Sequence, residues 1–301
     1  MMDKERLRTG IYGLLVGDAM GVPYEFHRAD EIPGWDEIGF VPPAGFERSY
    51  PEVLPGTWSD DGAQALCLLD SLLSCGEFDI DDLAERLLGW VDCGLWAVDH
   101  LVFDCGIQTM RSLRAYAGGI SPLESGFVVP DGKGNGSLMR VLPLALWHSG
   151  TDAELIENAH QQSLVTHGHI CNQVCCALYC LWVRYIIQGR EAIPAYQDAV
   201  ACLRQYYSAG DAYLYELDCC TAEGEPTGTG YVVDSIRSSL YLMKTYHSYA
   251  DVVRGAIALG NDTDTTAAIA GGLAAVAYGD VPEEWIRQLR GRELPEALLA
   301  R

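Results

Sequence analysis

Gly10-Ile11-Tyr12-Gly13-Leu14-Leu15-Val16-Gly17-Asp18-Ala19-Met20-Gly21 is the stretch that decides how this chain folds. Apolar side chains recur at helical spacing around it, so a helix is expected over residues 5–21. Its four glycines form a stripe with spacings of three, four and four residues. Each glycine costs a helix about 1 kcal/mol relative to alanine. Such a stripe therefore predicts that the backbone of a second helix approaches this one closely.

Helical periodicity also dominates the rest of the chain. Residues 30–56 are rich in proline, glycine and acidic residues, which predicts a long loop. Strand signals are limited to Phe127-Val128-Val129 and Tyr213-Leu214-Tyr215. No repeat and no low-complexity linker divides the chain, so we predict one compact all-α domain over residues 1–301. The further helices are expected at 60–75, 81–92, 105–117, 137–149, 152–165, 169–188, 193–208, 232–246, 249–259 and 265–278.

Composition restricts the partners and the location of the protein. The formal net charge of −22 over 301 residues repels phosphate backbones, which makes a nucleic-acid partner unlikely. No apolar run is expected to reach the roughly 18 residues that a membrane span needs. The N-terminus lacks the apolar region and cleavage site of a signal peptide. We therefore expect a cytoplasmic monomer without a membrane span.

Eleven cysteines are present, and none forms a Cys-x-x-Cys pair. Cys171, Cys175, Cys176 and Cys180 lie close together in one expected apolar helix. Free cysteine is among the most buried residue types, so small core residues in a reducing cytosol are the favoured interpretation. A zinc site is the alternative.

Two acidic clusters open apolar helices far apart in the sequence. Ser59-Asp60-Asp61 opens the first, and Asn261-Asp262-Thr263-Asp264-Thr265 opens the second. A serine cap with an acid in the first turn is a common helix start, but one carboxylate suffices for it. Helix capping and metal binding both stay open for each cluster taken alone.

Taken together, the clusters favour metal binding. Pro23 ends the first helix and leaves Glu25 just beyond it. If the three helix ends converge, five carboxylates share one pocket and repel one another unless they are protonated or bind cations. The second cluster fails as an EF-hand, because Ala267 and Leu273 stand where glycine and glutamate are needed. Oxygen ligands select Mg²⁺ or Mn²⁺ over zinc.

A glycine-rich loop at residues 132–137 precedes the helix expected at 137–149. Its spacing fits neither a dinucleotide-binding fingerprint nor a P-loop. Backbone N–H groups in such a loop can still bind phosphate, although an ordinary interhelical turn is equally compatible. His167 and His169 lie two residues apart without an evident third ligand. Asp104 alone is compatible with a solvated helix cap.

Six segments resemble one known family when they are taken in order. They include Gly13–Glu25, Gly56–Asp61, Phe103–Gly106, Gly134–Arg140, Gly230–Asp234 and Ala258–Ala267. Over nearly its whole length the chain is similar to the ADP-ribosylglycohydrolases, which include dinitrogenase reductase-activating glycohydrolases and vertebrate ADP-ribosyl-acceptor hydrolases. The resemblance implies an all-α fold with two Mg²⁺ or Mn²⁺ ions. It also implies hydrolysis of the bond between ADP-ribose and an acceptor.

The resemblance also implies roles for individual residues. Glu25 and Asp104 are the expected catalytic carboxylates, and both are also expected to contact substrate. The expected metal ligands are Ser59, Asp60, Asp61, Asp262, Asp264 and Thr265. The other expected substrate contacts are Gly134, Asn135, Gly136, Ser137, Met139, His167 and Tyr231.

Three positions depart from the pattern of the family. Ser59 replaces the usual threonine but keeps the hydroxyl, Gly62 is expected to loosen its helix start, and Ile107 replaces a polar residue. Ile107 is expected to share a helix face with Asp104, one turn away.

The expected substrate is a protein carrying mono-ADP-ribose on arginine. The alternatives are a hydrolase of another ADP-ribose conjugate, such as a serine-linked, nucleic-acid-linked or small-molecule conjugate, and a catalytically silent relative.

Overall fold

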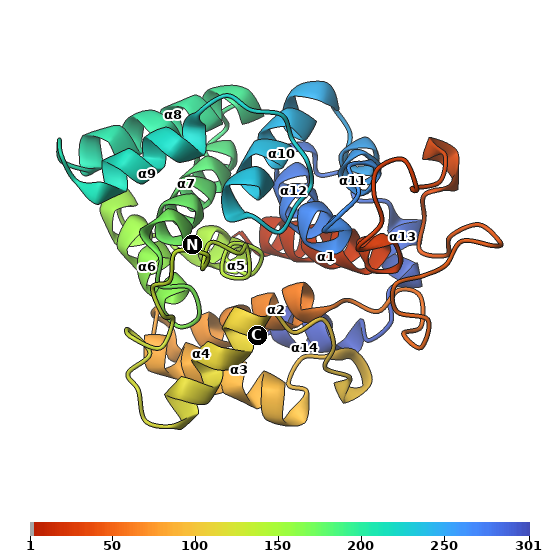
Figure 1. Ribbon diagram of the computed structural model, residues 1–301, viewed down its shortest axis with the longest axis horizontal. Helices are drawn as coiled ribbons and strands as arrows, with labels where there is room; N and C mark the ends of the chain where they lie inside the picture. The colour runs from red at the N-terminus through yellow and green to blue at the C-terminus, as the bar shows by residue number, and fades with distance from the viewer. Residues whose placement is uncertain (1–2) are drawn as a thin grey trace.

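The glycine stripe of α1 (Lys4–Gly21) packs against α12 (Thr263–Tyr278) in the computed structural model, which describes residues 3–301 (Figure 1). A Cβ atom added to Gly13 would lie 2.2 Å from the Cβ of Ala275, and one added to Gly21 would lie 2.4 Å from the Cα of Asp264. Only glycine permits such an approach. The two helices therefore run antiparallel, and the end of α1 meets the start of α12. The predicted close approach is confirmed.

The other helices surround this pair. In Figure 1, α2, α3 and α4 lie on one side, while α10 and α11 flank α12 on the other. Helices α6, α7, α8 and α9 form the remaining end, and one hydrophobic core runs through the whole assembly. The bounds are α2 (Asp60–Cys75), α3 (Ile80–Cys93), α4 (Ile107–Ala117), α5 (Leu142–Trp147), α6 (Asp152–Leu164), α7 (Ile170–Ile187), α8 (Ala192–Tyr206), α9 (Ala212–Thr221), α10 (Val232–Thr245), α11 (Tyr249–Ala258), α13 (Glu283–Gln288) and α14 (Glu293–Leu299).

The all-α prediction is confirmed, since residues 3–301 contain no β-strand and only two isolated bridges. Both strand signals were wrong. Residues 213–215 lie in α9, where Asp211 caps the helix by accepting a hydrogen bond from the N–H of Tyr213 (3.0 Å). Residues 127–129 form no helix or strand. Short apolar runs do not distinguish these states by themselves.

The helix expected at 137–149 is much shorter than predicted. Turns occupy the first residues, and α5 begins only at Leu142. Pro143 explains this start, because proline has no N–H to donate to the preceding turn and is tolerated only in the first turn of a helix. The irregular segment before it leaves residues 134–139 free to form a loop.

Helix α7 corrects one expectation about composition. It spans 18 residues with a mean hydropathy of 1.5, which is long and apolar enough for a membrane span by these two criteria. In the structure, 83% of that segment is buried inside the protein. A core helix passes the same test, so this is weak evidence for a span.

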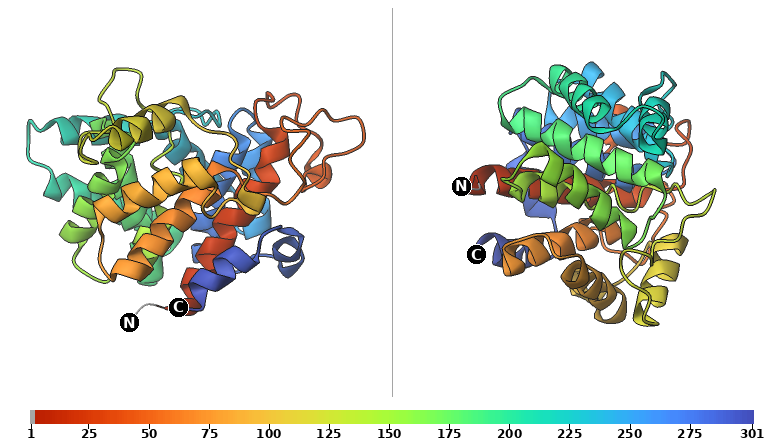
Figure 2. Two further views of the ribbon diagram at one scale, coloured as in Figure 1. Left: turned by 90° about the horizontal axis from the view of Figure 1, so that it is seen from below. Right: turned by 90° about the vertical axis from the view of Figure 1, so that its left-hand side faces the viewer.

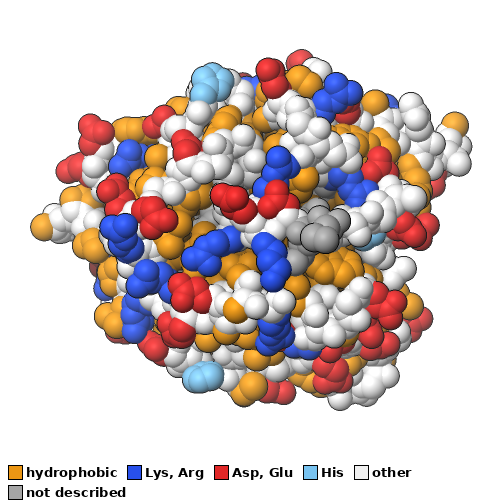
Figure 3. Space-filling model, turned by 180° about the vertical axis from the view of Figure 1, so that it is seen from behind, with side chains coloured by type: hydrophobic (Ala, Val, Ile, Leu, Met, Phe, Trp, Pro, Cys, Tyr) orange, Lys and Arg blue, Asp and Glu red, His pale blue; other side chains and the backbone are white. Residues whose placement is uncertain are grey.

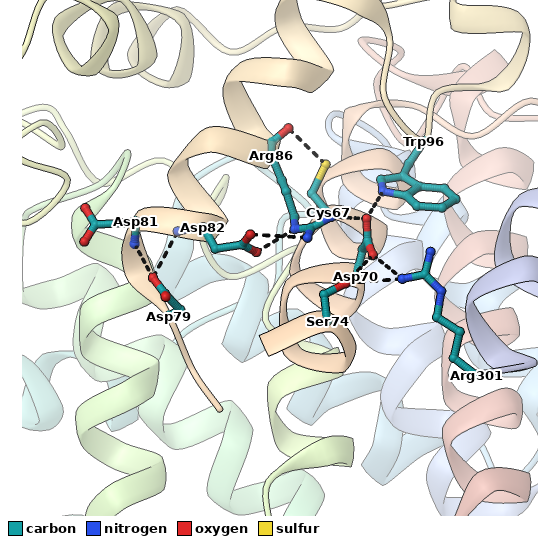
Figure 4. Close-up of polar contacts among 9 residues, drawn as sticks. All are labelled: Cys67, Asp70, Ser74, Asp79, Asp81, Asp82, Arg86, Trp96 and Arg301. Carbon is teal, nitrogen blue, oxygen red and sulfur yellow. Dashed lines mark hydrogen bonds and ion pairs between the residues drawn. The ribbon is translucent and has the colours of Figure 1, made fainter. Parts of the chain in front are cut away.

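Buried Asp70 ties the end of the chain to α2 and α3. Its carboxylate accepts hydrogen bonds from Arg86, from Arg301 Nη1 (2.7 Å) and from Trp96 Nε1 (3.2 Å) (Figure 4). Helix α14 also lies beside α1 (Figure 2). Charge-assisted hydrogen bonds of this kind are stronger than neutral ones, so they fasten Arg301 and α3 to α2.

Basic and acidic side chains alternate on the face opposite the view of Figure 1. Figure 3 shows Lys and Arg among Asp and Glu across this face. This face therefore carries no large patch of basic side chains alone.

Candidate metal centre and substrate pocket

The turn after α1 fixes Glu25 beside the start of α12. A short 3₁₀ helix, η1 (Val22–Tyr24), contains Pro23 and ends at Glu25. The N–H of Phe26 donates to the carbonyl of Asn261, and the N–H of Asn261 donates to the carbonyl of His27, both at 2.6 Å. Phe26 and Asn261 have positive φ angles of 63° and 64°. Such backbone is strained in residues with a side chain and often occurs at functional sites.

Ser59 caps α2, as its sequence position predicts, and Asp18 accepts further hydrogen bonds from the same helix start. The N–H of Asp61 donates to Ser59 Oγ (3.3 Å). Fully buried Asp18 reaches across from α1 and accepts from the N–H groups of Ser59 (2.9 Å) and Gly62 (2.8 Å). Gly62 also has no room for a Cβ atom, which would lie 2.7 Å from Leu15. Gly62 therefore fits a firmly held helix start, and the expected loosening was wrong.

Hydroxyl and amide side chains connect the start of α12 to its neighbours. Thr265 Oγ1 donates to Asp61 Oδ2 (3.2 Å), which links α12 to α2. Ser59 Oγ donates to the same oxygen at 3.1 Å. From the glycine-rich loop, Asn135 Nδ2 donates to Asp262 Oδ2 (2.8 Å).

The predicted convergence of the acidic clusters is found in the structure. Two sets of carboxylates each offer one oxygen per residue, and within each set these atoms lie within 4.8 Å of one another. The first set joins Glu25, Asp262 and Asp264, and the second joins Asp60, Asp61 and Asp104.

Asp104 joins the cluster from the segment before α4. It has a positive φ of 53°, and α4 begins three residues later with Gly106 as its cap. Asp104 and Ile107 therefore do not share a helix face, although both line the pocket. Tyr50, in the long loop, donates its hydroxyl to Asp104 Oδ1 (2.7 Å) and also lies beside Glu25.

Burial and mutual repulsion raise the pKa values of the cluster. Burial raises the pKa of Asp18 to about 7, although the N–H groups of Ser59 and Gly62 oppose the shift. Burial, followed by the charges of Asp104 and Asp262, raises the pKa of Glu25 to about 9. Burial is also the largest cause of the raised pKa values of Asp60, Asp61, Asp104, Asp262 and Asp264.

These acids fit hard divalent cations. Within residues 3–301, three buried carboxylate oxygens have no hydrogen-bond partner, namely Glu25 Oε2, Asp61 Oδ1 and Asp264 Oδ2. All three belong to the cluster, and a buried acceptor without a partner is costly. A cation would satisfy these oxygens and oppose the repulsion.

Buried Arg140 is linked to the acidic centre through one side chain of α2. It donates to Gln64 Oε1 (3.0 Å), and Gln64 Nε2 in turn donates to Asp60 Oδ2 (3.0 Å). One arginine that acts through the amide of Gln64 does not balance the charge of the six carboxylates in the two sets. The acidic centre therefore remains strongly anionic when its groups are ionised.

Without a divalent cation, we expect the protein to lose stability as pH rises from about 4 to about 9. Carboxyl groups with raised folded pKa values bind more protons when folded than when unfolded, so stability falls as they ionise. The window runs from the ordinary carboxyl pKa to the value of about 9 for Glu25. Thermal unfolding of chelator-treated protein should show this decline, and excess Mg²⁺ should reduce it. A flat profile without cations would mean that the carboxylates do not repel one another in the folded protein.

A pocket of about 760 Å³ opens over this acidic centre. That volume suits a ligand of nucleotide size. Of the predicted metal and catalytic residues, Glu25, Asp60, Asp104, Asp262 and Thr265 line it, whereas Ser59, Asp61 and Asp264 are buried and do not line it.

The glycine-rich loop forms another wall of this pocket. Gly134, Asn135, Gly136, Met139 and His167 line it. His167 lies directly against the loop, because a Cβ atom on Gly136 would stand 2.8 Å from its Cε1.

Two of the predicted substrate contacts lie outside this pocket. Ser137 is fully buried and accepts a hydrogen bond from Ser163 Oγ (2.8 Å). Tyr231 borders a neighbouring hollow with Lys133.

Sequence reasoning missed several residues around the centre, and four of them have clear positions. Asp18 and Tyr50 contact predicted site residues, while Phe26 and Thr229 line the pocket. The position of Asp18 within the glycine stripe was the one available signal, because a carboxylate on a close-packed helix needs a buried partner.

Comparison with known proteins assigns the chain to a family. The ADP-ribosylglycohydrolase family model matches residues 2–301. ADP-ribosylarginine hydrolase Tri1 of Pseudomonas putida (strain GB-1) is 30% identical over 95% of this chain and 74% of the relative. ADP-ribosyl-[dinitrogen reductase] glycohydrolase of Rhodospirillum rubrum is 28% identical over 95% of this chain and 90% of its own length. A solved "ADP-ribosylglycohydrolase-related protein complex" matches with a TM-score of 0.77 and 29% identity, covering 99% of this chain and 96% of that one. This chain belongs to the ADP-ribosylglycohydrolase family.

Proposed function

We propose that this protein removes ADP-ribose from arginine side chains by metal-dependent hydrolysis. The observation that carries the proposal is the acidic centre beneath a nucleotide-sized pocket, with three buried carboxylate oxygens left unpartnered within residues 3–301. The arginine linkage is suggested by the names of the Tri1 relatives, which are ADP-ribosylarginine hydrolases.

The proposed cofactors are two Mg²⁺ or Mn²⁺ ions. When bound, these cations would orient the ribose hydroxyls and polarise water. The donor set contains only oxygen, as these cations prefer. The residues that would hold them are Ser59, Asp60, Asp61, Asp262, Asp264 and Thr265.

Glu25 is the proposed general base. Its Oε2 is one of the unpartnered oxygens in the described part of the chain, and the residue lines the pocket. Asp104 already accepts the hydroxyl of Tyr50, which fixes its orientation and partly opposes the rise of its pKa caused by burial. With a pKa of about 9, Glu25 would be protonated near neutral pH without cations, so cations bound at the centre would have to lower that pKa before Glu25 could take a proton from water. Asp104 would then orient the acceptor and stabilise positive charge. Cleavage of a glycosidic bond passes through an oxocarbenium-like state, which nearby carboxylates stabilise.

The glycine-rich loop is the proposed binding element for the ADP part. Gly134 and Gly136 bring backbone close to the pocket, and Asn135 is held by Asp262 and Ser235 Oγ (3.1 Å). Backbone amides without side chains can approach phosphate oxygens closely.

A substrate panel tests the proposal. Full-length protein should release free ADP-ribose from an arginine-linked peptide in the presence of Mg²⁺ or Mn²⁺. Activity should disappear with a chelator and return when the cation is restored. Full activity in cation-free protein would overturn the metal-dependent reaction. Release from serine- or nucleic-acid-linked substrates alone would overturn the arginine linkage.

A second candidate is hydrolysis of another ADP-ribose conjugate. Ile107 lines the pocket and is 89% exposed, so an apolar side chain faces the space where an acceptor would enter. It cannot hydrogen-bond a guanidinium. Relatives named ADP-ribosylhydrolase ARH3 are also similar to this chain, for instance at 24% identity in Xenopus tropicalis.

We expect Ile107→Asn to increase the preference for arginine-linked over serine-linked peptides by about fivefold, since one added hydrogen bond contributes roughly 1 kcal/mol. The measurement compares kcat/KM for both peptides in wild type and variant. Ile120→Asn is a control, because Ile120 is also an exposed isoleucine and lies beyond α4. An unchanged ratio would mean that Ile107 does not contribute to acceptor choice.

A further inference from the structure

Three cysteines meet in a buried cluster outside the acidic centre. The Sγ atoms of Cys171, Cys175 and Cys220 lie within 4.8 Å of one another, and the three residues are at most 2% exposed. Cys171 and Cys175 are one turn apart on α7, whereas Cys220 comes from α9. Cys175 Sγ and Cys220 Sγ are 3.3 Å apart, and all three thiols are free in the described structure.

This arrangement has the size of a thiolate metal site. Zinc–sulfur bonds of about 2.3 Å in tetrahedral geometry place the sulfur atoms roughly 3.8 Å apart. The observed triangle reaches that size through small side-chain adjustments. We propose that Cys171, Cys175 and Cys220 bind a thiophilic d¹⁰ cation of the Zn²⁺ type, at a site separate from the acidic centre.

Glu216 is the proposed fourth ligand. It lies beside Cys171, and its side chain is only 11% exposed. Its carboxylate currently pairs with Lys133 Nζ at 3.2 Å. Three sulfur ligands with one carboxylate oxygen complete a four-coordinate set of the kind that zinc accepts.

The cluster favours one thiolate, at Cys171, whereas burial raises the pKa of Cys175 and the hydrogen bond with Cys171 raises that of Cys220. Hydrogen bonds from the thiols of Cys175 and Cys220, together with nearby Lys133, lower the pKa of Cys171. Metal ligands must be deprotonated, so binding would release the remaining thiol protons, and affinity would rise with pH.

Two other cysteines of α7 provide an internal comparison. Cys176 interacts with Ser137 Oγ (3.6 Å) and Gln162 Nε2 (3.2 Å), and Cys180 is buried in the core. Neither belongs to a group of three candidate ligands in the described residues. The sequence placed all four cysteines of α7 together, but the structure selects only Cys171 and Cys175 and adds Cys220.

The site lies behind the glycine-rich loop. Lys133, the partner of Glu216, directly precedes Gly134, and its carbonyl accepts from the N–H of Val232 (2.9 Å). A cation bound here would tie α9 to α7 and release Lys133 from Glu216. Occupancy of this site can be measured as metal binding, without a measurement of hydrolase activity.

Titration of the reduced full-length protein with Cd²⁺ tests the proposal. Excess Mg²⁺ would occupy the acidic centre, and only thiolate ligands give the ultraviolet sulfur-to-cadmium absorption. We expect one equivalent of Cd²⁺ to saturate this band, and Zn²⁺ to displace it. Cys220→Ala should remove most of the band, whereas Cys180→Ala, a matched change on α7, should retain it. Zn²⁺ should raise the Tm of wild type and Cys180→Ala but not of Cys220→Ala.

Several outcomes would overturn the site. These are absence of the band in wild type, an equal band in Cys220→Ala, and a Cys175–Cys220 disulfide whose reduction yields no metal binding. If Cys220→Ala does not fold, Glu216→Gln tests the metal site instead. It retains the thiols, so it should keep the band but bind Cd²⁺ at least tenfold more weakly. Unchanged affinity in that variant would exclude Glu216 as a ligand, and unchanged affinity together with no Zn²⁺-induced rise in Tm would overturn the whole site.

Discussion

Asp264→Asn is expected to lower kcat by more than about 100-fold while raising the Tm of the cation-free protein. Its Oδ1 accepts from the N–H of Thr265 (2.9 Å), a bond that asparagine can keep. Its Oδ2 is buried without a partner among the described residues, so the change chiefly removes a charge. Removing a residue that only hydrogen-bonds to a metal ligand typically lowers metal affinity or activity by about 10- to 100-fold. Loss of a ligand should therefore cost more.

The stability gain has an independent cause. Burial, followed by the charges of Glu25, Asp104 and Asp61, raises the pKa of Asp264 well above its ordinary value. Removing the group relieves this repulsion, most strongly at high pH. A gain of about 1 kcal/mol would raise Tm by roughly 2 °C. Calorimetry at pH 8 with chelator, paired with ADP-ribose release in Mg²⁺, measures both effects.

Asp70→Asn is the matched control, because Asp70 is also a buried helical aspartate. Its carboxylate is paired with Arg86 and Arg301 rather than with other acids (Figure 4). Removing its charge leaves Arg301 without its carboxylate partner and Arg86 with Asp82 alone, and should lower Tm. Activity at moderate temperature should stay near wild type. If Asp264→Asn lowers Tm as Asp70→Asn does, the acidic centre is not a cluster of repelling charges.

The sequence predicted the centre of the fold because its signals were local and strong. The glycine stripe of α1 required a close helix partner, and the acids at 60–61 and 262–264 required neutralisation. The close approach also places an acidic residue at the end of α1, since Gly21 packs directly on Asp264. The helix start at Ser59 followed from capping preferences, whereas Asp262 precedes α12 without a side-chain capping hydrogen bond.

Other features depend on tertiary contacts that no local pattern encodes. Tyr50 lies in an irregular loop, and only the fold brings its hydroxyl to Asp104. No sequence pattern indicated that Asp18 of α1 accepts hydrogen bonds from the N–H groups at the start of α2. Cys220 lies 45 residues beyond Cys175, so helical spacing could not group them. The position of α4 was shifted by the left-handed backbone of Asp104.

Glu25→Gln is expected to lower kcat by roughly 10²- to 10⁴-fold, the range for loss of a general base. Binding of ADP-ribose should change little, because the loop around Asn135 is the proposed site for the diphosphate. Glutamine keeps the shape of the side chain, so the turn after α1 should stay intact. Single-turnover kinetics and calorimetry with ADP-ribose separate the two effects.

Glu31→Gln is the control, since Glu31 lies in the same loop but is about half exposed and pairs with Arg28. That variant should keep wild-type kcat. Glu25 also belongs to one of the two carboxylate sets, so a role in holding a cation predicts a different result. In that case Mg²⁺ affinity would fall together with kcat, and saturating Mg²⁺ would restore much of the activity. A general base leaves Mg²⁺ affinity nearly unchanged and kcat low at every Mg²⁺ concentration. The dependence of kcat on Mg²⁺ therefore decides which of the two roles Glu25 has.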